Sequence, residues 1–472
     1  MKIYKISRFI FLFVLLYCVC QIPIAAYQQV SCVMHIHSVF SANGRQTLEQ
    51  IAENAKNSGI NVIIPADHDI QEFEYGIWPF SRLIKKTIIN NSILYMGGSK
   101  YLNEIHRVQE KYPDMVIIPG VESAPYYYWT GNPLKKSLTM NNWHKHILLI
   151  GLNDPRSYDN LPVLGNQKSK TFNPILLWPA VFIIAGFFLI RNRTLLILFQ
   201  LAALLLLLYN YPYNSYMFNQ YNGDQKELPY QNIINYTANA GGLTFWAHPE
   251  ARNWKNSENF NGVSIKTKPY PESILDTFGY TGFSYFWEGT DIIGKPEGFW
   301  DTALTQYCKG TRKSPVWATA ELDYIEDGLR NNWLNLNKNI LYVEKLDKEN
   351  VMDSLRKGRF FITSKQKPDS PDPVMNDFAV SSDKGSAIFG ETLNYSGSVK
   401  ISFNLNTTAR MKTNTTIRLI ENGRIVQEFN KKIPLKFEYI FTPSTDRSYC
   451  RFEIDFDCGV KLVSNPVFLY NN

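Results

Sequence analysis

Two apolar runs near the middle of the chain constrain its fold more than any other feature. They cover residues 172–190 and 194–211, and only Arg191-Asn192-Arg193 separates them. A helix of such a length is ~27 Å long, which is close to the hydrocarbon thickness of a bilayer. Neither run has a polar face, whereas helices that cover a soluble core are usually amphipathic. The pattern predicts a transmembrane helical hairpin at 166–215 rather than a pair of buried core helices.

A third apolar run, residues 9–26, follows three basic residues and predicts a signal peptide or a signal anchor within residues 1–29. We favour an uncleaved anchor, because no small residue stands two positions before the cleavage sites that the run offers. The positive-inside tendency places these basic residues and Arg191-Asn192-Arg193 in the cytoplasm. The parts on either side of the hairpin, about 30–165 and 215–472, are then expected outside the cytoplasm, in the periplasm or at the cell surface.

The composition gives no sign of a nucleic-acid partner. The formal net charge is +7 over 472 residues, and no dense cluster of Lys and Arg occurs. A chain of this length can form two folded domains. The six cysteines include no Cys-x-x-Cys pair, so a thiolate zinc site is not expected. Cys450 and Cys458 fit either a disulfide or two buried thiols.

A strand, a helix and a second strand follow the first apolar run. His35 and His37 are two residues apart, so they point to the same side of a strand, where two imidazoles can reach one metal. Thr47 is placed to cap a helix, and residues 61–65 form an apolar strand that leads into Asp67-His68-Asp69. This order predicts a βαβ unit of a barrel or an open α/β sheet. Taken alone, the two histidines also fit a solvated strand face.

As a whole, this stretch resembles the opening of the PHP domain, the polymerase and histidinol phosphatase family. The hallmarks of that opening are an early His-x-His-Ser, a helix, and a strand that ends in Asp-His. Five later segments resemble further motifs of the family in the same order: 115–122, which ends in Glu122; 144–151; 241–249; Asp323 after the strand 316–320; and 346–363. The resemblance implies an α/β fold, a distorted (β/α)7 barrel whose two parts are 30–165 and 216–363.

Six residues that can bind a metal stand at the ligand positions of the family: His35, His37, Glu122, His146, His248 and Asp323. The resemblance implies that the first three and Asp323 hold one metal, and that Glu122 bridges to a second metal held by His146 and His248. Imidazole and carboxylate ligands suit zinc, manganese or iron(II). Asp323 is also a candidate proton acceptor in catalysis, and His68 is a candidate proton donor or phosphate ligand.

The sequence departs from the family pattern at two places. Ser41 is followed by Ala42-Asn43-Gly44, where the family often has an aspartate, and Ile325 stands where a late histidine is expected, although Glu326 is adjacent. In the family, residues at these places and at the position of His68 form a third metal site. We therefore expect two divalent metal ions and an empty or altered third site.

Two arginines and the C-terminal region complete the expectations. Arg252 and Arg330 follow ligand motifs, and each can bind a phosphate through two hydrogen bonds, although a solvated loop arginine is the alternative. Beyond a polar, proline-bearing linker, residues 374–472 show short runs with period two, and Asn422-Gly423 is typical of a hairpin turn. This pattern predicts an immunoglobulin-like β-sandwich.

These features together predict a metal-dependent hydrolase outside the cytoplasm, most consistent with a phosphoesterase that cleaves a phosphomonoester or phosphodiester with a metal-activated water. Its partners would be a small phosphorylated or other ester substrate and the lipid bilayer. Two alternatives remain open. The same water could attack a carbamate or amide, or the chain could be a non-catalytic, metal-containing membrane sensor or binding module.

Overall fold

The computed structural model describes residues 27–471 except 78–80, 82–83, 136, 211–214, 252–257 and 261–262. The apolar run of the predicted anchor, residues 9–26, and Arg252 lie outside the described residues.

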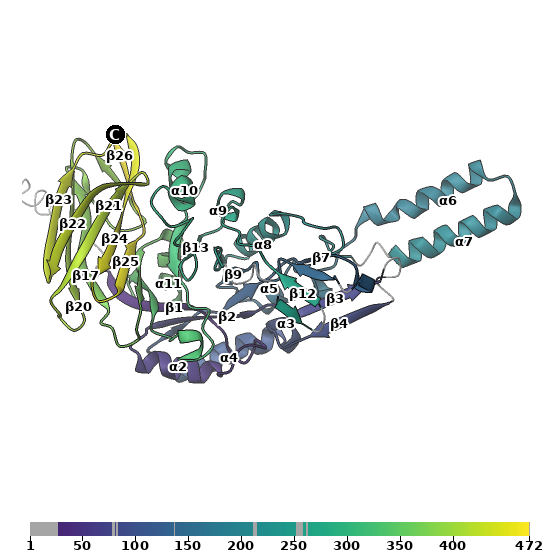
Figure 1. Cartoon of the computed structure of the whole chain (residues 1–472), viewed down its shortest axis with the longest axis horizontal. Helices are drawn as coiled ribbons and strands as arrows, with labels where there is room; N and C mark the ends of the chain where they lie inside the picture. Colours follow the sequence, from purple (N-terminus) through teal and green to yellow (C-terminus); the bar gives the residue numbers. More distant parts are fainter. Residues whose placement is uncertain are drawn as a thin grey trace, which may run out of the picture.

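The N-terminal part is a mixed α/β structure around one long sheet (Figure 1), in which seven strands lie in the order β14-β13-β10-β9-β6-β2-β1. Their bounds are β1 (Gln28–Ile36), β2 (Val62–His68), β6 (Gly120–Ser123), β9 (Ile147–Ile150), β10 (Leu243–Trp246), β13 (Gly282–Phe286) and β14 (Trp317–Ala320), and the short β5 (Val116–Ile117) also pairs with β2. Within this run β9 is antiparallel to both neighbours, and the other pairs are parallel.

The chain after β14 returns to the first strand of this order. The backbone N–H of Tyr324 donates to the carbonyl of His35 at 3.0 Å, and the carbonyl of Tyr324 accepts from the N–H of His37 at 2.8 Å. These bonds bring the segment that carries Asp323 against the end of β1. A mixed α/β fold is therefore confirmed, whereas the finer assignment to a PHP-type barrel stays a prediction.

Helices cover this sheet, and the first shows how the sequence determines them. In α2 (Leu48–Asn57) the Thr47 side chain accepts from the N–H of Gln50, whose side chain accepts from the N–H of Thr47. This capping box begins the helix where the sequence predicts it. The remaining helices of this part are α3 (Ile93–Met96), α4 (Gly98–Lys111), α5 (Pro155–Asp159), α8 (Leu228–Asn239), α9 (Ser273–Asp276), α10 (Phe299–Cys308) and α11 (Lys348–Lys357), with 3-10 turns at Pro133–Lys135, Gln167–Ser169 and Leu329–Asn331.

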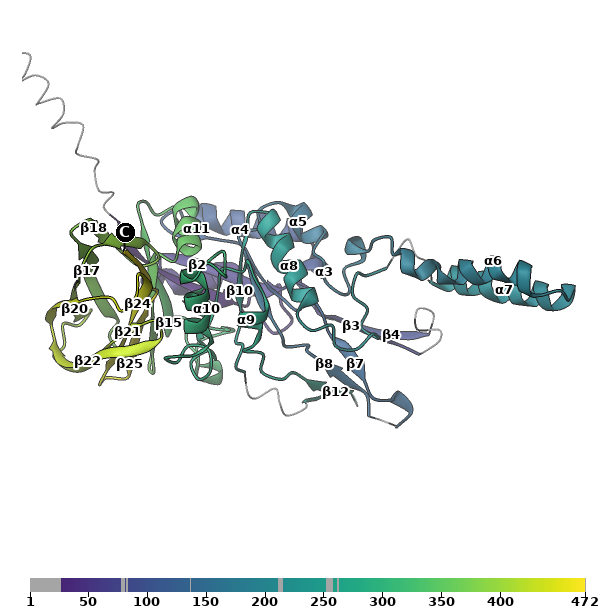
Figure 2. The same ribbon diagram turned by 90° about the horizontal axis from the view of Figure 1, so that it is seen from above.

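Two small sheets extend the body toward one end of the molecule (Figure 2). One is the pair β3 (Glu72–Gly76) and β4 (Lys85–Ile89). The other has the order β11-β12-β8-β7, with bounds β7 (Tyr128–Thr130), β8 (Thr139–Asn141), β11 (Glu258–Phe260) and β12 (Val263–Lys266).

A helical hairpin projects from this end of the body, away from the C-terminal strands (Figures 1 and 2). It consists of a 3-10 turn, Pro174–Leu177, then α6 (Trp178–Leu189) and α7 (Arg193–Asn210). The 18 residues of α7 form the one described helix that is long and apolar enough to cross a membrane, whereas α6 is shorter. The first arm is helical over Pro174–Leu189, with a 3-10 turn that leads directly into α6, and is therefore shorter than the predicted run 172–190.

The C-terminal region is all-β, as the sequence predicts. One sheet has the order β18-β17-β20-β23, and the other runs β25-β24-β21-β22, with β26 beside β24 and β19 beside β26. The bounds are β17 (Pro373–Ser382), β18 (Gly385–Ala387), β19 (Thr392–Tyr395), β20 (Val399–Thr407), β21 (Thr413–Glu421), β22 (Arg424–Ile433), β23 (Leu435–Phe441), β24 (Arg447–Phe456), β25 (Val460–Ser464) and β26 (Val467–Asn471). Cys450 and Cys458 are free thiols in the part of the chain that the structure describes.

The sandwich shares a sheet with the N-terminal part. Strands β15 (Asn337–Val343) and β16 (Phe360–Lys365) continue the long sheet beyond β1, and β16 pairs with β25. The two parts therefore meet through backbone hydrogen bonds as well as side chains.

A buried ion pair reinforces this junction. Arg451 of β24 is fully buried and donates from Nε and Nη2 to the two carboxylate oxygens of Asp301 in α10, both at 2.9 Å. The hydroxyl of Tyr449 donates to the same carboxylate at 2.8 Å, and the guanidinium lies 4.5 Å from the ring centroid of Trp300. A carboxylate in such a position depends on its cationic partner.

We expect Arg451→Ala to lower the free energy of unfolding by about 3–5 kcal/mol, because it leaves Asp301 buried without a cation. Arg424→Ala is the matched control. Arg424 also pairs across the junction, with Glu297, but both side chains are mostly exposed, so the loss should be at most about 1 kcal/mol. Urea titration of both variants in detergent measures the difference, and equal losses would contradict the assignment.

Candidate metal centre

The carboxylate of Glu122, in β6, lies at the centre of a cluster of five imidazoles. Its side chain is buried, and each of its oxygens faces a different set of rings. Nearest Oε1 are His146 Nδ1 at 2.5 Å, His248 Nε2 at 3.0 Å and His35 Nε2 at 3.1 Å. Nearest Oε2 are His68 Nδ1 at 3.2 Å and His37 Nε2 at 3.4 Å. One carboxylate thus connects two groups of nitrogen donors.

These side chains come from strand ends and from the residues beside them. His35 lies near the end of β1, His68 closes β2, His146 directly precedes β9, and His248 follows β10. Because these strands are neighbours in one sheet, residues far apart in the sequence meet at one place. The structure thereby brings together the six residues of the sequence-predicted ligand set, since Asp323 Oδ1 also lies 3.1 Å from His37 Nε2.

Backbone conformation helps to aim three of these residues. His35, His248 and Asp323 have φ angles of 66°, 30° and 47°, which lie in or near the left-handed region that non-glycine residues seldom adopt. Such conformations cost free energy and concentrate at functional sites, where the surrounding structure holds them in place. The hydrogen bonds between Tyr324 and the end of β1 hold the segments of His35 and Asp323 together.

A second layer of polar groups orients the imidazoles. Glu321 is fully buried, and its Oε2 lies 3.0 Å from Nδ1 of His35. The hydroxyl of Tyr270 lies 3.1 Å from Nδ1 of His248, and the carbonyl of Trp143 lies 3.0 Å from Nε2 of His146. Groups of this kind fix the ring orientation of metal-binding histidines. In each of these three rings, the nitrogen facing Glu122 is the one that the outer partner leaves available.

Sequence reasoning missed these outer partners. The sequence offered one indication for Glu321, which lies two residues before the predicted ligand Asp323. Tyr270 and Trp143 gave none, because their roles arise from loops that only the fold brings near the histidines. Asp67, part of the predicted strand-end motif, accepts from the hydroxyl groups of Ser38 and Ser41 at 2.6 and 2.8 Å, which organises the turn after β1.

Electrostatics at the centre favour ionised carboxylates. Burial opposes ionisation of Glu122, but the surrounding imidazoles, His146 foremost, hold its pKa well below the usual range. Burial likewise opposes ionisation of Asp323, but a hydrogen bond to His37 and the charges of nearby histidines lower its pKa. For His68, burial comes first and lowers the pKa well below its usual value, so its imidazole is neutral at physiological pH.

The residues fit a divalent metal ion. Two groups offer nitrogen and oxygen atoms close enough to share one ion: His35, His37 and Glu122, and His68, Glu122 and His146. His35 Nε2 is buried and, among the described residues, lacks a hydrogen bond of good geometry although it points at Glu122. Buried nitrogen and carboxylate donors that converge in this way can hold a metal.

The remaining candidate residues lie around this centre or away from it. Ile325 is buried and offers no ligand atom, and Glu326 forms an ion pair with Arg45. The ring of His144 lies 5.9 Å from that of His146, and burial lowers the pKa of His144 to about 3. Arg330 is exposed in a 3-10 turn. An anion-binding role for Arg330 stays a prediction.

The comparisons with known proteins identify no family. No protein-family model matches the chain, and no curated protein matches it. Six solved chains match, and one of them is the crystal structure of an engineered protein from a structural genomics consortium, with 13% identity and a TM-score of 0.16. That match covers 21% of this chain and 20% of the engineered one, so the chain spans about a fifth of its length. A likeness this low carries no argument about fold or function.

We expect Glu321→Gln to weaken metal binding by about 10–100-fold, because the amide no longer provides the charged partner that orients His35. Equilibrium dialysis against zinc or manganese, followed by elemental analysis, measures the affinity. His106→Ala, on the exposed face of α4, is the control and should bind metal like the unaltered chain. Equal affinities in the two variants would contradict the role assigned to Glu321.

Proposed function

We propose that the chain is a metal-dependent hydrolase that cleaves a phosphate ester. One observation carries the proposal: a single buried carboxylate, Glu122, lies within 3.4 Å of five imidazoles and is shared by the two groups of donor atoms that could each hold an ion. A bridging carboxylate of this kind suits a pair of divalent ions, of which zinc, manganese and iron(II) match the ligands. The order of the PHP-like motifs in the sequence supports the same proposal.

Two bound ions would supply an activated water and neutralise charge on the ester oxygens. Within that scheme, Glu122 would be shared by the two ions, and His35, His37, His146 and His248 would hold them. Asp323, whose side chain is 15% exposed beside His37, would bind an ion; because its pKa is lowered, it would be a weak acceptor for the proton of the water. Burial of the other donors excludes bulk water from the far side of the centre.

The proposal assigns His68 a different role from the one that the sequence suggested. Its Nδ1 lies 3.2 Å from Glu122 Oε2, and it shares a group of donor atoms with Glu122 and His146. Its ring also stacks on that of His37, with centroids 5.0 Å apart. These contacts favour His68 as a ligand on the Oε2 side over a proton donor to the leaving group.

We further propose that the hairpin lies in a bilayer, with the metal centre outside the cytoplasm. Apolar side chains are exposed along both helices; Phe188 is 84% and Ile197 66% exposed. A protein partner would cover one face, whereas lipid covers every side. The side chain of Gln200 in α7 donates to the carbonyl of Ile183 at 2.7 Å, which joins the two helices of the hairpin.

We expect the metal-loaded chain to hydrolyse phosphate esters and His35→Ala to lose at least about a hundredfold of that activity, because a metal-activated nucleophile is removed. The measurement is a panel of phosphomonoesters, phosphodiesters, carbamates and amides, each with zinc or manganese and with a chelator. If only carbamates or amides were hydrolysed, the phosphoesterase proposal would be wrong and a carbamate or amide hydrolase would take its place. No turnover of any member by a metal-loaded chain would favour a sensor or binding module.

The proposed orientation places Arg191 and Arg193 in the cytoplasm. Trypsin added to intact cells should therefore leave the bond after Arg191 uncut, and permeabilised cells should show the cleavage. The lysines of the body, such as the exposed Lys345, serve as the internal control for protease access from outside. Cleavage at Arg191 in intact cells would contradict the proposed topology and favour the opposite orientation.

A further inference from the structure

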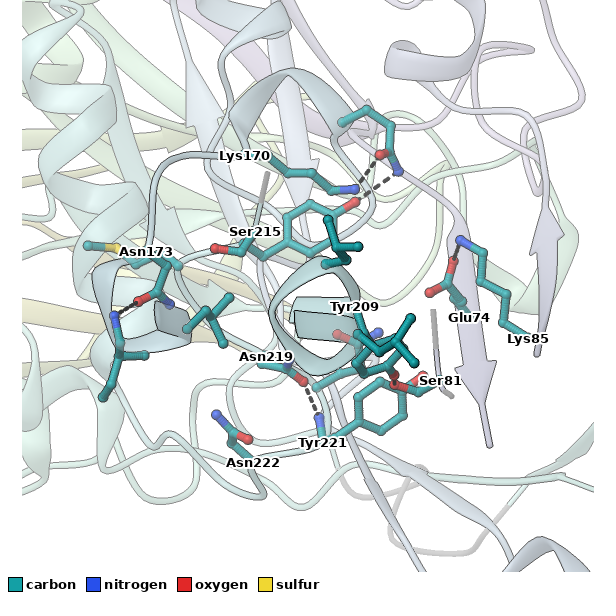
Figure 3. A pocket seen from close by; sticks show the side chains of 18 residues that line it. Glu74, Ser81, Lys85, Lys170, Asn173, Tyr209, Ser215, Asn219, Tyr221 and Asn222 are labelled. Carbon is teal, nitrogen blue, oxygen red and sulfur yellow. Dashed lines mark hydrogen bonds and ion pairs between the residues drawn. The ribbon is translucent and has the colours of Figure 1, made fainter. Parts of the chain in front are cut away.

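A cavity of about 710 Å³ lies where the hairpin joins the body. Helix α7, the 3-10 turn before α6, the segment after the hairpin and the pair β3–β4 surround it (Figure 3). Its volume falls within the range of pockets that bind small molecules. It is separate from the metal centre, since none of the six predicted ligands lines it.

One side of the cavity wall is apolar and the opposite side is polar. Ile175, Leu205 and Leu208 give an apolar side, and Ile175 and Leu208 remain more than half exposed. Such side chains gain free energy when an apolar chain covers them. Because Leu205 and Leu208 belong to the proposed membrane helix, the apolar side continues into the region where acyl chains would lie.

The opposite side of the wall is polar and carries more cations than carboxylates. Its charged groups among the described residues are Lys85, Lys170 and Glu74. Lys85 pairs with Glu74 at 2.6 Å, and the ammonium of Lys170 lies 4.7 Å from the ring centroid of Tyr216. In Figure 3 the Glu74–Lys85 pair lies on the β3–β4 side and Lys170 on another side of the α7 helix.

Hydroxyl and amide groups accompany these charges. The hydroxyl groups of Tyr209 and Ser81 lie 3.0 Å apart, which links the last turn of α7 to the body across the cavity. At the base of the hairpin, the amide of Asn210 donates to the carbonyl of Leu176 at 3.0 Å, and Thr171 pairs with Ser215. These bonds connect the hairpin to the body and so fix the position of the apolar side of the cavity relative to the polar side.

We propose that this cavity binds a phospholipid with an anionic headgroup, its phosphate near Lys170 and an acyl chain along Leu205 and Leu208. The polar side of the wall matches the headgroup of such a lipid, and the apolar side matches its acyl chain. The cavity lies where a hairpin in a bilayer would meet the headgroup layer. The bound lipid would fix the hairpin against β3, the strand that follows His68. The inference rests on the proposed insertion of the hairpin in a bilayer, and it does not depend on hydrolysis.

The test uses the full chain in detergent with a metal chelator present, so that no ester is cleaved. The probe is dihexanoyl phosphatidylglycerol, titrated by calorimetry. We expect Lys170→Ala to weaken binding about tenfold, because a charge-assisted hydrogen bond to phosphate is lost. Lys168→Ala is the matched control, since Lys168 pairs with Asp159 and does not line the cavity. It should bind the lipid like the unaltered chain.

A second pair of variants tests the acyl-chain side. Leu208→Trp fills the cavity and should weaken binding at least tenfold, whereas Leu206→Trp, exposed on the same helix outside the lining, should not. Inorganic phosphate and dihexanoyl phosphatidylcholine should bind at least tenfold more weakly than the anionic lipid. Equal effects within either pair of variants, or equal binding of free phosphate or of the zwitterionic lipid, would overturn the proposal.

Discussion

The proposed chemistry depends on one buried carboxylate, Glu122, and on the imidazoles that surround it. A carboxylate taken out of water is costly unless positive charge or hydrogen-bond donors compensate it. Five histidine rings within 3.4 Å of its two oxygens supply that compensation. The same donor atoms suit divalent cations, so the arrangement that makes the buried charge tolerable could also hold a metal ion.

The fold brings the members of this cluster together. Neighbouring strands bring His35, His68, Glu122 and the residues beside β9 and β10 to one place, and the backbone bonds of Tyr324 add Asp323. Glu321 and Tyr270 then orient individual rings. The sandwich contributes through the shared sheet at β16 and the Arg451–Asp301 pair, which hold it firmly to the body.

The sequence predicted features whose signals are local. The Thr47 cap, the strand ending in Asp67-His68, and the Asn422-Gly423 turn, with φ of 49° and 86°, depend on neighbouring residues and match the structure. The resemblance to the PHP family also implied which residues would meet, and the structure brings those six side chains together. Contacts between distant segments left no such signal. Tyr270 and Arg451 could not be predicted, and the first arm of the hairpin, helical over Pro174–Leu189, is shorter than the apolar run suggested.

The central proposal is that Glu122 would be shared by two metal ions held by the surrounding histidines. X-ray absorption spectroscopy of the zinc- or manganese-loaded chain tests it most directly. The account predicts imidazole nitrogen in the first shell, at roughly 2.0–2.1 Å for zinc, and a second metal at about 3.5–4 Å, with both features lost in Glu122→Gln. A single metal with oxygen ligands only, or a spectrum that Glu122→Gln leaves unchanged, would contradict it.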